Sequence, residues 1–114
     1  MSIMREYNPD KWVMLKFNHN GQNIHKILAT FYGGYLNGDS WKLNSGVTKI
    51  EEDGQCYLFH GSSGSVYRCH KNAYGMGGYT SGIYASFQKQ VNEAADVTME
   101  LLAPETNFME IHYE

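Results

Sequence analysis

The stretch that decides the fold is Val13-Met14-Leu15-Lys16-Phe17-Asn18-His19-Asn20-Gly21-Gln22-Asn23-Ile24-His25-Lys26-Ile27-Leu28. At its centre, Asn20-Gly21 stands between two runs in which apolar and polar residues alternate. Asn-Gly is the strongest short-range signal for a β-hairpin, because both turn residues need a positive φ. A two-residue loop places Phe17 opposite Ile24 and Val13 opposite Leu28. The stretch therefore predicts a tight antiparallel hairpin with one apolar face.

Three further turn signals follow: Asn37-Gly38, Asp53-Gly54 and Gly61-Ser62-Ser63-Gly64. A strand expected over 39–52 contains Gly46, which predicts a bend or bulge there. The pairs set by two-residue loops are Tyr32 with Leu43, Gly34 with Trp41, Lys49 with Leu58, and Cys56 with Cys69. All four turns agree on one more apolar face. That face holds Val13, Leu15, Phe17, Ile24, Leu28, Tyr32, Trp41, Leu43, Val47, Leu58 and Tyr67.

A helix is expected after the glycine-rich loop at 74–79. Ile83, Phe87 and Val91 recur at four-residue spacing, and Thr80 or Ser81 is a suitable N-cap. These residues predict a helix over 81–94 that packs on the apolar sheet face.

The segment 95–103 is compatible with helix or strand. Alternation at 97–101 and 108–113, around the turn at 104–107, favours a C-terminal hairpin. The expected fold class is α+β: an antiparallel β-meander of five strands, then one helix and this hairpin.

Length and composition indicate one folded domain, spanning 1–114. With 42% hydrophobic and 18% charged residues, the chain is not of the disordered class. No apolar run approaches the ~20 residues that cross a bilayer, and the first residues lack the apolar stretch of a secretory signal. We therefore expect a cytoplasmic protein with no membrane partner, in which both cysteines are free thiols.

Charge and aromatic residues suggest surfaces for a partner. All nine Lys and Arg lie at or before Lys89, whereas six of the twelve acids follow it. This acidic segment, including Glu100, Glu105 and Glu110, is expected to meet a basic surface of a partner or of the domain itself. Tyr35 and Trp41, near the turn at 37–38, are typical interface anchors, although they are equally suited to closing one end of the core.

The glycine-rich loop suggests a small ligand. Its candidate residues are Gly75, Gly77, Gly78, Thr80 and Ser81, whose N–H groups and helix end are suited to a phosphate. The spacing matches neither the dinucleotide fingerprint nor the Walker loop. A plain flexible connection is the alternative.

Cys56, His60, Cys69 and His70 carry the side chains of a zinc site. The expected registers put three of them on one face and His70 on the other, so no metal site is expected. Adjacent Cys69 and His70 point to opposite faces and are not expected to form a catalytic pair. We therefore expect no catalytic residue and no cofactor.

Lysine and arginine side chains among aromatic residues on the strands invite a nucleic-acid interpretation. The sequence pI near 5.9 and the lack of a clustered basic run favour a solvated sheet face instead. Nucleic acid is therefore not the expected partner.

Residues 33–54, GGYLNGDSWKLNSGVTKIEEDG, together with YLFHG at 57–61 and SVYRCHK at 65–71, resemble small uncharacterised proteins of tailed bacteriophages. The resemblance covers the middle third of the chain and carries no functional residue. It implies an accessory role in the cytoplasm of an infected bacterium, where small proteins often inhibit host defences or host enzymes.

Three functions follow as hypotheses. The first is a non-enzymatic binding protein, a phage-encoded accessory factor that binds and inhibits a host defence protein. The second is a small-ligand binder that sequesters a nucleotide or nucleotide-derived signal in the glycine-rich loop. The third is an enzyme that uses Cys69 or a histidine. Exposed edges of an open meander also make a homodimer a candidate assembly.

Overall fold

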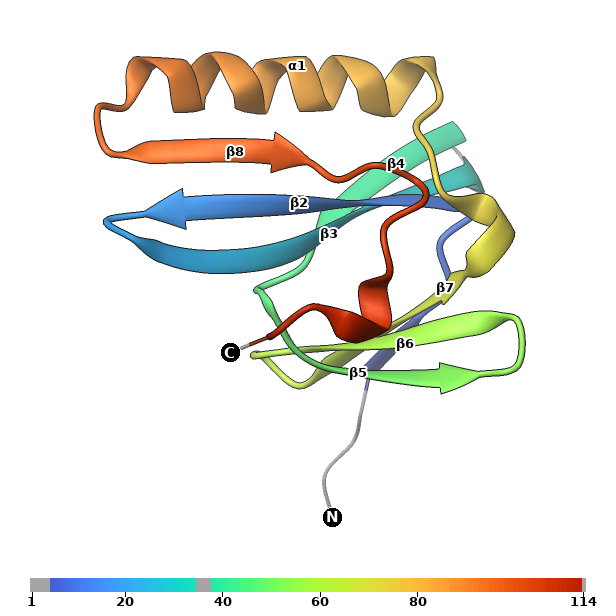
Figure 1. Cartoon of the computed structure of the whole chain (residues 1–114). Helices are drawn as coiled ribbons and strands as arrows, with labels where there is room; N and C mark the ends of the chain where they lie inside the picture. The colour runs from blue at the N-terminus through green and yellow to red at the C-terminus, as the bar shows by residue number, and fades with distance from the viewer. Residues whose placement is uncertain (1–4, 35–37, 114) are drawn as a thin grey trace.

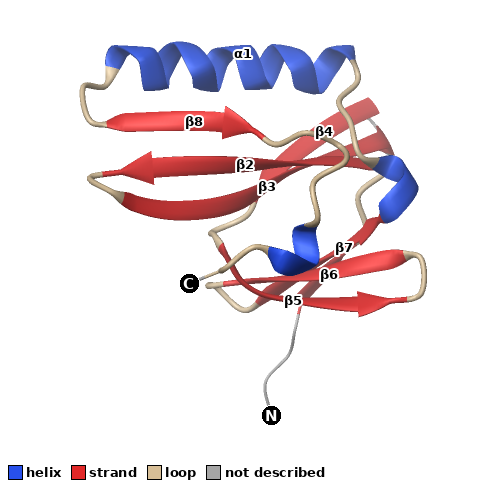
Figure 2. Ribbon diagram, in the orientation of Figure 1, coloured by secondary structure: helices blue, strands red, loops and turns tan. Residues whose placement is uncertain are grey.

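The computed structural model describes residues 5–34 and 38–113, which form three layers (Figures 1 and 2). A central sheet, in the order β4-β3-β2-β8, lies between the helix α1 and an outer sheet, in the order β1-β7-β6-β5. The strands are β1 (Arg5–Tyr7), β2 (Lys11–His19), β3 (Gln22–Gly34), β4 (Gly38–Leu43), β5 (Val47–Asp53), β6 (Cys56–Gly61), β7 (Ser65–His70) and β8 (Val97–Leu101). The helix α1 spans Gly78–Glu93, and the 3-10 turns η1 and η2 span Lys71–Ala73 and Phe108–Glu110.

The expected α+β class is confirmed, but the single meander is wrong, because the hairpins belong to two sheets. The expected strand over 39–52 divides at 44–46 into β4 and β5. Gly46 has a φ of 133°, which favours glycine, so the predicted bend is a complete crossing between sheets. Asn44 fixes the crossing point, since its Oδ1 accepts the Ile27 N–H at 2.8 Å and its own N–H donates to the Ile27 carbonyl at 3.1 Å.

The first hairpin has the predicted register. Asn20 and Gly21 both have positive φ, at 54° and 83°, as the two-residue turn requires. Phe17 pairs with Ile24 and Val13 with Leu28.

The other three registers slip from the predicted ones. The slip is four residues between β3 and β4, two between β5 and β6, and one between β6 and β7. An even slip keeps every side chain on its predicted face, whereas an odd slip reverses them all. The observed pairs are Leu28 with Leu43, Glu51 with Leu58, and Tyr57 with Cys69.

The odd slip comes from a three-residue loop at 62–64, where Gly64 takes a φ of 93°. It turns Phe59 into the core and Cys56 outward, while Cys69 stays on the inward face with Tyr67. The prediction that the two cysteines face each other is therefore wrong. Both are free thiols; Cys69 is buried and Cys56 half-buried.

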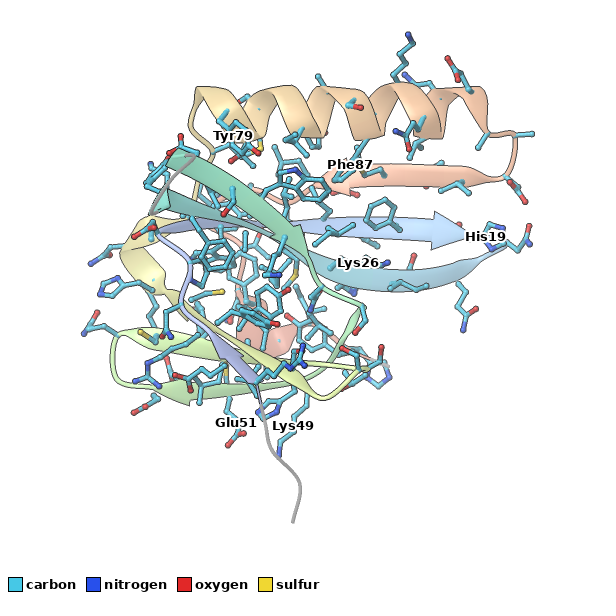
Figure 3. The ribbon with its side chains drawn as sticks, turned by 180° about the vertical axis from the view of Figure 1, so that it is seen from behind. His19, Lys26, Lys49, Glu51, Tyr79 and Phe87 are labelled. Carbon is cyan, nitrogen blue, oxygen red and sulfur yellow. The ribbon has the colours of Figure 1, made fainter. Side chains whose placement is uncertain are left out.

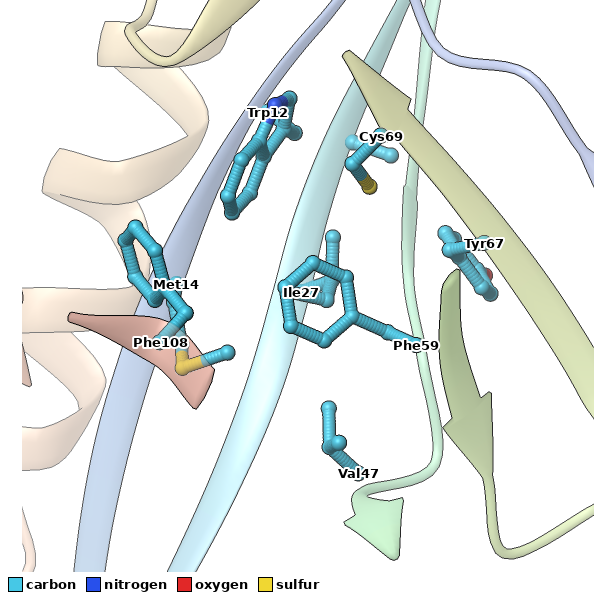
Figure 4. Close-up of a cluster of buried hydrophobic side chains, with 9 residues drawn as sticks. Trp12, Met14, Ile27, Val47, Phe59, Tyr67, Cys69 and Phe108 are labelled. Carbon is cyan, nitrogen blue, oxygen red and sulfur yellow. The ribbon is translucent and has the colours of Figure 1, made fainter. Parts of the chain in front are cut away.

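An aromatic core fills the space between the two sheets (Figure 4). The Trp12 ring lies 4.7 Å from that of Tyr74 and 5.3 Å from that of Phe59, and its Nε1–H donates to the His70 carbonyl at 2.7 Å. The sequence predicted one face more apolar than the other, which was expected to carry Ile27, Phe31 and Phe59 among polar residues, yet β2 and β3 are buried on both faces. The buried residues between the sheets are Trp12, Met14, Ile27, Ala29, Val47, Phe59, Tyr67, Cys69 and Phe108.

Helix α1 packs on the expected face of the central sheet, where Ile83 and Phe87 contact the cluster of Val13, Leu15 and Leu28. The helix begins at Gly78, earlier than predicted, and its N-cap is Gly77, with no side-chain cap. The proposed caps Thr80 and Ser81 therefore lie inside the first turn.

The prediction for the C-terminal segment is confirmed only in part. Strand β8 forms, but it pairs with β2 rather than with the residues after the turn at 104–107. Those residues form η2, and Phe108 inserts into the core. The predicted C-terminal hairpin is therefore wrong, because a buried aromatic contact outweighs the local alternation.

Candidate functional site

A groove opens between the second half of α1 and the adjoining strands of the central sheet (Figure 3). Its volume is about 410 Å³. Phe87 reaches down from the helix, and Lys26 lies across from it on the sheet. The lining residues are Phe17, Ile24, Lys26, Leu43, Phe87, Gln90, Val91, Ala94 and Val97.

The groove exists because the face of the central sheet is wider than the single helix that covers it. Four strands spaced about 4.8 Å apart make a face wider than one helix, whose diameter is about 10 Å. Helix α1 runs alongside β8 and β2, while β4 crosses the sheet diagonally (Figures 1 and 3). One helix therefore leaves the β3–β4 half of this face uncovered.

Large apolar side chains lie on the uncovered half. Ile24, Tyr32 and Trp41 are 38%, 40% and 36% exposed, and their registers place all three on the helix-side face. The Trp41 ring meets the Phe87 ring edge-on, with centroids 5.4 Å apart. We call the groove together with Ile24, Tyr32 and Trp41 the docking face.

Lys26 is the one charged side chain among the residues that line the groove. Its Nζ lies 5.9 Å from the centroid of the Phe17 ring, so the stem covers apolar surface while the ammonium stays at the rim. An apolar floor with one cation at its edge suits an occupant that is apolar and carries an acid.

The predicted partner residues do not gather in one place. Trp41 belongs to the docking face, and Tyr35 lies outside the described residues. Glu100 is on β8, at the other edge of the sheet, opposite Lys16. Glu105 and Glu110 lie in the turn that follows and in η2. The acids therefore form no common surface with Trp41.

The predicted phosphate loop has its hydroxyls engaged within the fold. Thr80 is fully buried and hydrogen-bonded to Thr30, and Ser81 Oγ donates to the Gly77 carbonyl at 2.9 Å. The Tyr32 hydroxyl lies 2.6 Å from the position that a Cβ at Gly77 would take. Gly75 and Gly78 complete the connection into α1. Packing against Tyr32 therefore explains the glycine at position 77, and the φ of 148° at Gly75 favours glycine there.

The four candidate metal ligands are spread over two faces of the outer sheet. Cys69 points into the core, where burial raises the pKa of its thiol well above the ordinary value. Cys56, His60 and His70 lie on the outward face, where His60 Nε2 is 2.6 Å from Glu51 Oε1. Across residues 5–34 and 38–113, no three His, Cys, Asp or Glu side chains group as a metal site.

The basic residues on the strands are also dispersed. Lys26 and Lys42 lie on opposite faces of the central sheet. On the outer sheet, Arg68 pairs with Asp53 at 2.8 Å, and the Lys71 ammonium contacts a carboxylate of β5. The described residues therefore present no single basic surface.

Ile24, Lys26 and Gln90 are site residues that the sequence did not single out. The one signal for them is the count of strands against helices: a four-stranded face with a single helix has to leave some apolar residues uncovered.

No helix in the described part of the chain is long and apolar enough to cross a membrane. Comparison with protein-family models, curated proteins and solved structures finds no match to this chain.

Proposed function

We propose that this chain is a non-enzymatic binding protein that holds an amphipathic helix of another protein on the docking face. The observation that supports this most is the exposure of Ile24, which lines an open apolar groove, and of Trp41, whose ring lies against Phe87 of that lining. Apolar surface of this kind, with an aromatic anchor and few charges, is typical of protein interfaces.

The space beside α1 favours a helix as the occupant. Helices pack side by side with axes about 8–10 Å apart, so a partner helix next to α1 would complete the layer that one helix leaves unfinished. Such a helix places side chains at i, i+3, i+4 and i+7 into the groove. A small ligand is usually enclosed over roughly 70–90% of its surface. This groove is open instead, and the exposed Trp41 ring lies against Phe87 of its lining.

Charge defines the partner further. The Lys26 ammonium at the rim favours a helix with an Asp or Glu beside its apolar stripe. The resemblance of the middle third of the chain to small phage proteins supports a host protein as the partner, with inhibition as the result of binding.

Photo-crosslinking tests the proposal. A benzoylphenylalanine placed at position 24 should crosslink a bacterial protein through one amphipathic helical segment. The same probe at Met109, which is 42% exposed in η2 away from the docking face, should not. Crosslinks to a second copy of this chain would instead identify a homodimer interface and overturn the proposal.

The crosslinked segment then allows a quantitative test. As a synthetic peptide it should bind the native protein in calorimetry, and Ile24→Glu should weaken binding at least about tenfold by placing a charge on the apolar floor. Met109→Glu is the matched control and should bind as the native protein does. Equal loss in both variants would assign the effect to charge alone and contradict the proposed site.

A further inference from the structure

A second hollow, of about 280 Å³, lies where the chain crosses from β4 to β5, between the two sheets and on the other side of the central sheet from the docking face. Its lining is about half polar and half apolar and contains no Asp or Glu. We call it the crossing pocket. Its residues are Tyr7, Lys42, Leu43, Asn44, Ser45, Ser63, Ser65 and Tyr67.

The amide of Asn44 is the most informative group in this pocket. Because Oδ1 accepts the Ile27 N–H at 2.8 Å, the amide orientation is fixed and Nδ2 is the group left to donate. Asn44 is 3% exposed, and its Nδ2 is buried with no hydrogen-bond partner in the described structure. An unpaired buried donor is unfavourable and is expected to meet an acceptor that the protein itself does not supply.

Gly61 borders the same space. A Cβ built there would lie 3.2 Å from Ser45 Oγ and 3.7 Å from Asn44 Nδ2. Its backbone is not left-handed, so space rather than conformation favours glycine at this position. The end of β6 thus packs closely against Ser45 and Asn44, and a side chain at position 61 would crowd the unpaired amide.

The remaining polar groups are also donors. The Ser63 N–H donates to Ser45 Oγ at 3.0 Å and the Ser45 hydroxyl donates to Ser63 Oγ at 3.2 Å, which leaves the Ser63 hydroxyl proton to donate elsewhere. The Lys42 Nζ lies 5.1 Å from the Tyr7 ring centroid and pairs with no carboxylate among the described residues. Burial raises the pKa of Tyr67 to about 12, so its hydroxyl stays protonated.

We propose that the crossing pocket binds a phosphate monoester. The lining contains the Lys42 ammonium, the Ser63 and Ser65 hydroxyls and the Asn44 amide, which we assign as donors to the oxyanion, and it carries no negative charge. The rings of Tyr7 and Tyr67, with centroids 5.1 Å apart, form the apolar wall against which the organic part of the ligand lies. This inference is independent of the docking face.

Calorimetry with adenosine 5′-monophosphate and with inorganic phosphate, each at matched ionic strength in KCl, tests the site. We expect binding at millimolar or tighter affinity, and shifts of the Ser63 and Ser65 amide signals in NMR spectra. If the nucleotide binds at least about tenfold more tightly, the ester is recognised through its ring; equal affinities identify free phosphate as sufficient. No binding of either at about 10 mM would overturn the proposal.

Substitutions locate the binding. Lys42→Met keeps the apolar stem, removes the ammonium of an exposed side chain, and should weaken binding at least about tenfold. Lys26→Met, on the opposite face of the central sheet, is the matched control and should change affinity less than about twofold. Equal losses in the two variants would show non-specific charge attraction and overturn the site. Ser65→Ala, which leaves the Asn44–Ile27 bond intact, should weaken binding by a smaller factor.

Discussion

Both faces of the central sheet carry large apolar side chains, and the faces differ in what covers them. Ile27 and Ile24 are the same residue type on the same strand, yet Ile27 is fully buried against the outer sheet and Ile24 is 38% exposed beside α1. A sheet covers a sheet over its whole width, whereas one helix covers about half of it. Burial here is therefore decided by the breadth of the covering layer, not by the hydrophobicity of the residue.

Truncating one phenylalanine on each side gives the largest expected effect. Phe59 is fully buried between the sheets, so Phe59→Ala should lower the free energy of unfolding by about 3–5 kcal/mol. Phe87 is half-buried at the groove. Phe87→Ala should lower the free energy of unfolding by about half as much, because the change removes less buried apolar surface and leaves an open space rather than a cavity. Urea unfolding measures both. Equal losses of unfolding free energy in the two variants would mean that the docking face is closed in solution.

A buried threonine pair gives the next largest effect. The hydroxyls of Thr30, on β3, and Thr80, in the first turn of α1, bond to each other and are shielded from water. Thr80→Val should cost about 1–3 kcal/mol, because the Thr30 hydroxyl is left unpaired. The double variant Thr30→Val/Thr80→Val should cost less than either single change. Additive losses in a double-mutant cycle would contradict a coupled pair.

The comparison of the two faces also explains what the sequence could and could not predict. The Asn20-Gly21 hairpin was predictable to the residue, because both turn positions and both flanking patterns are local. The stripe of Ile83 and Phe87 likewise predicted which face α1 covers. The crossing at Asn44 was not predictable beyond a bend, since a strand that changes sheets has the same alternation as one that does not.

The outer sheet was mispredicted for a different reason. The loop at 62–64 has three residues instead of two, and this single residue moves Phe59 and Cys56 from the expected faces. The docking face and the crossing pocket were also predictable only in part. Trp41 was recognisable as an exposed aromatic anchor, but Ile24 becomes part of a surface only once the width of the covering layer is known. Asn44 is distinguished by one unpaired atom, which no sequence pattern shows.

The smallest expected effect is a pH dependence of stability that arises from His25, on the face covered by the outer sheet. His25 lies on the same face as Ile27, is 7% exposed, and packs edge-on against Tyr113 with ring centroids 5.3 Å apart. Burial, with a contribution from the positive charge of Lys16, lowers its pKa below the ordinary 6.5, while Glu100 acts weakly in the opposite direction. The folded protein therefore keeps His25 neutral at pH values at which the unfolded chain takes up a proton.

The sign of the pH dependence follows. Because the unfolded state binds more protons at His25, the contribution of this residue to the free energy of unfolding should be largest above pH 6.5 and should fall as the pH drops from there toward the lowered pKa. Urea unfolding between about pH 7.5 and 5.5 should show a shallower fall for His25→Gln than for the native protein. Lys16→Met should show an intermediate fall, because burial, the larger cause, remains. A native-like slope in His25→Gln would mean that water reaches this histidine, and that the face against the outer sheet is less tightly covered than Ile27 indicates.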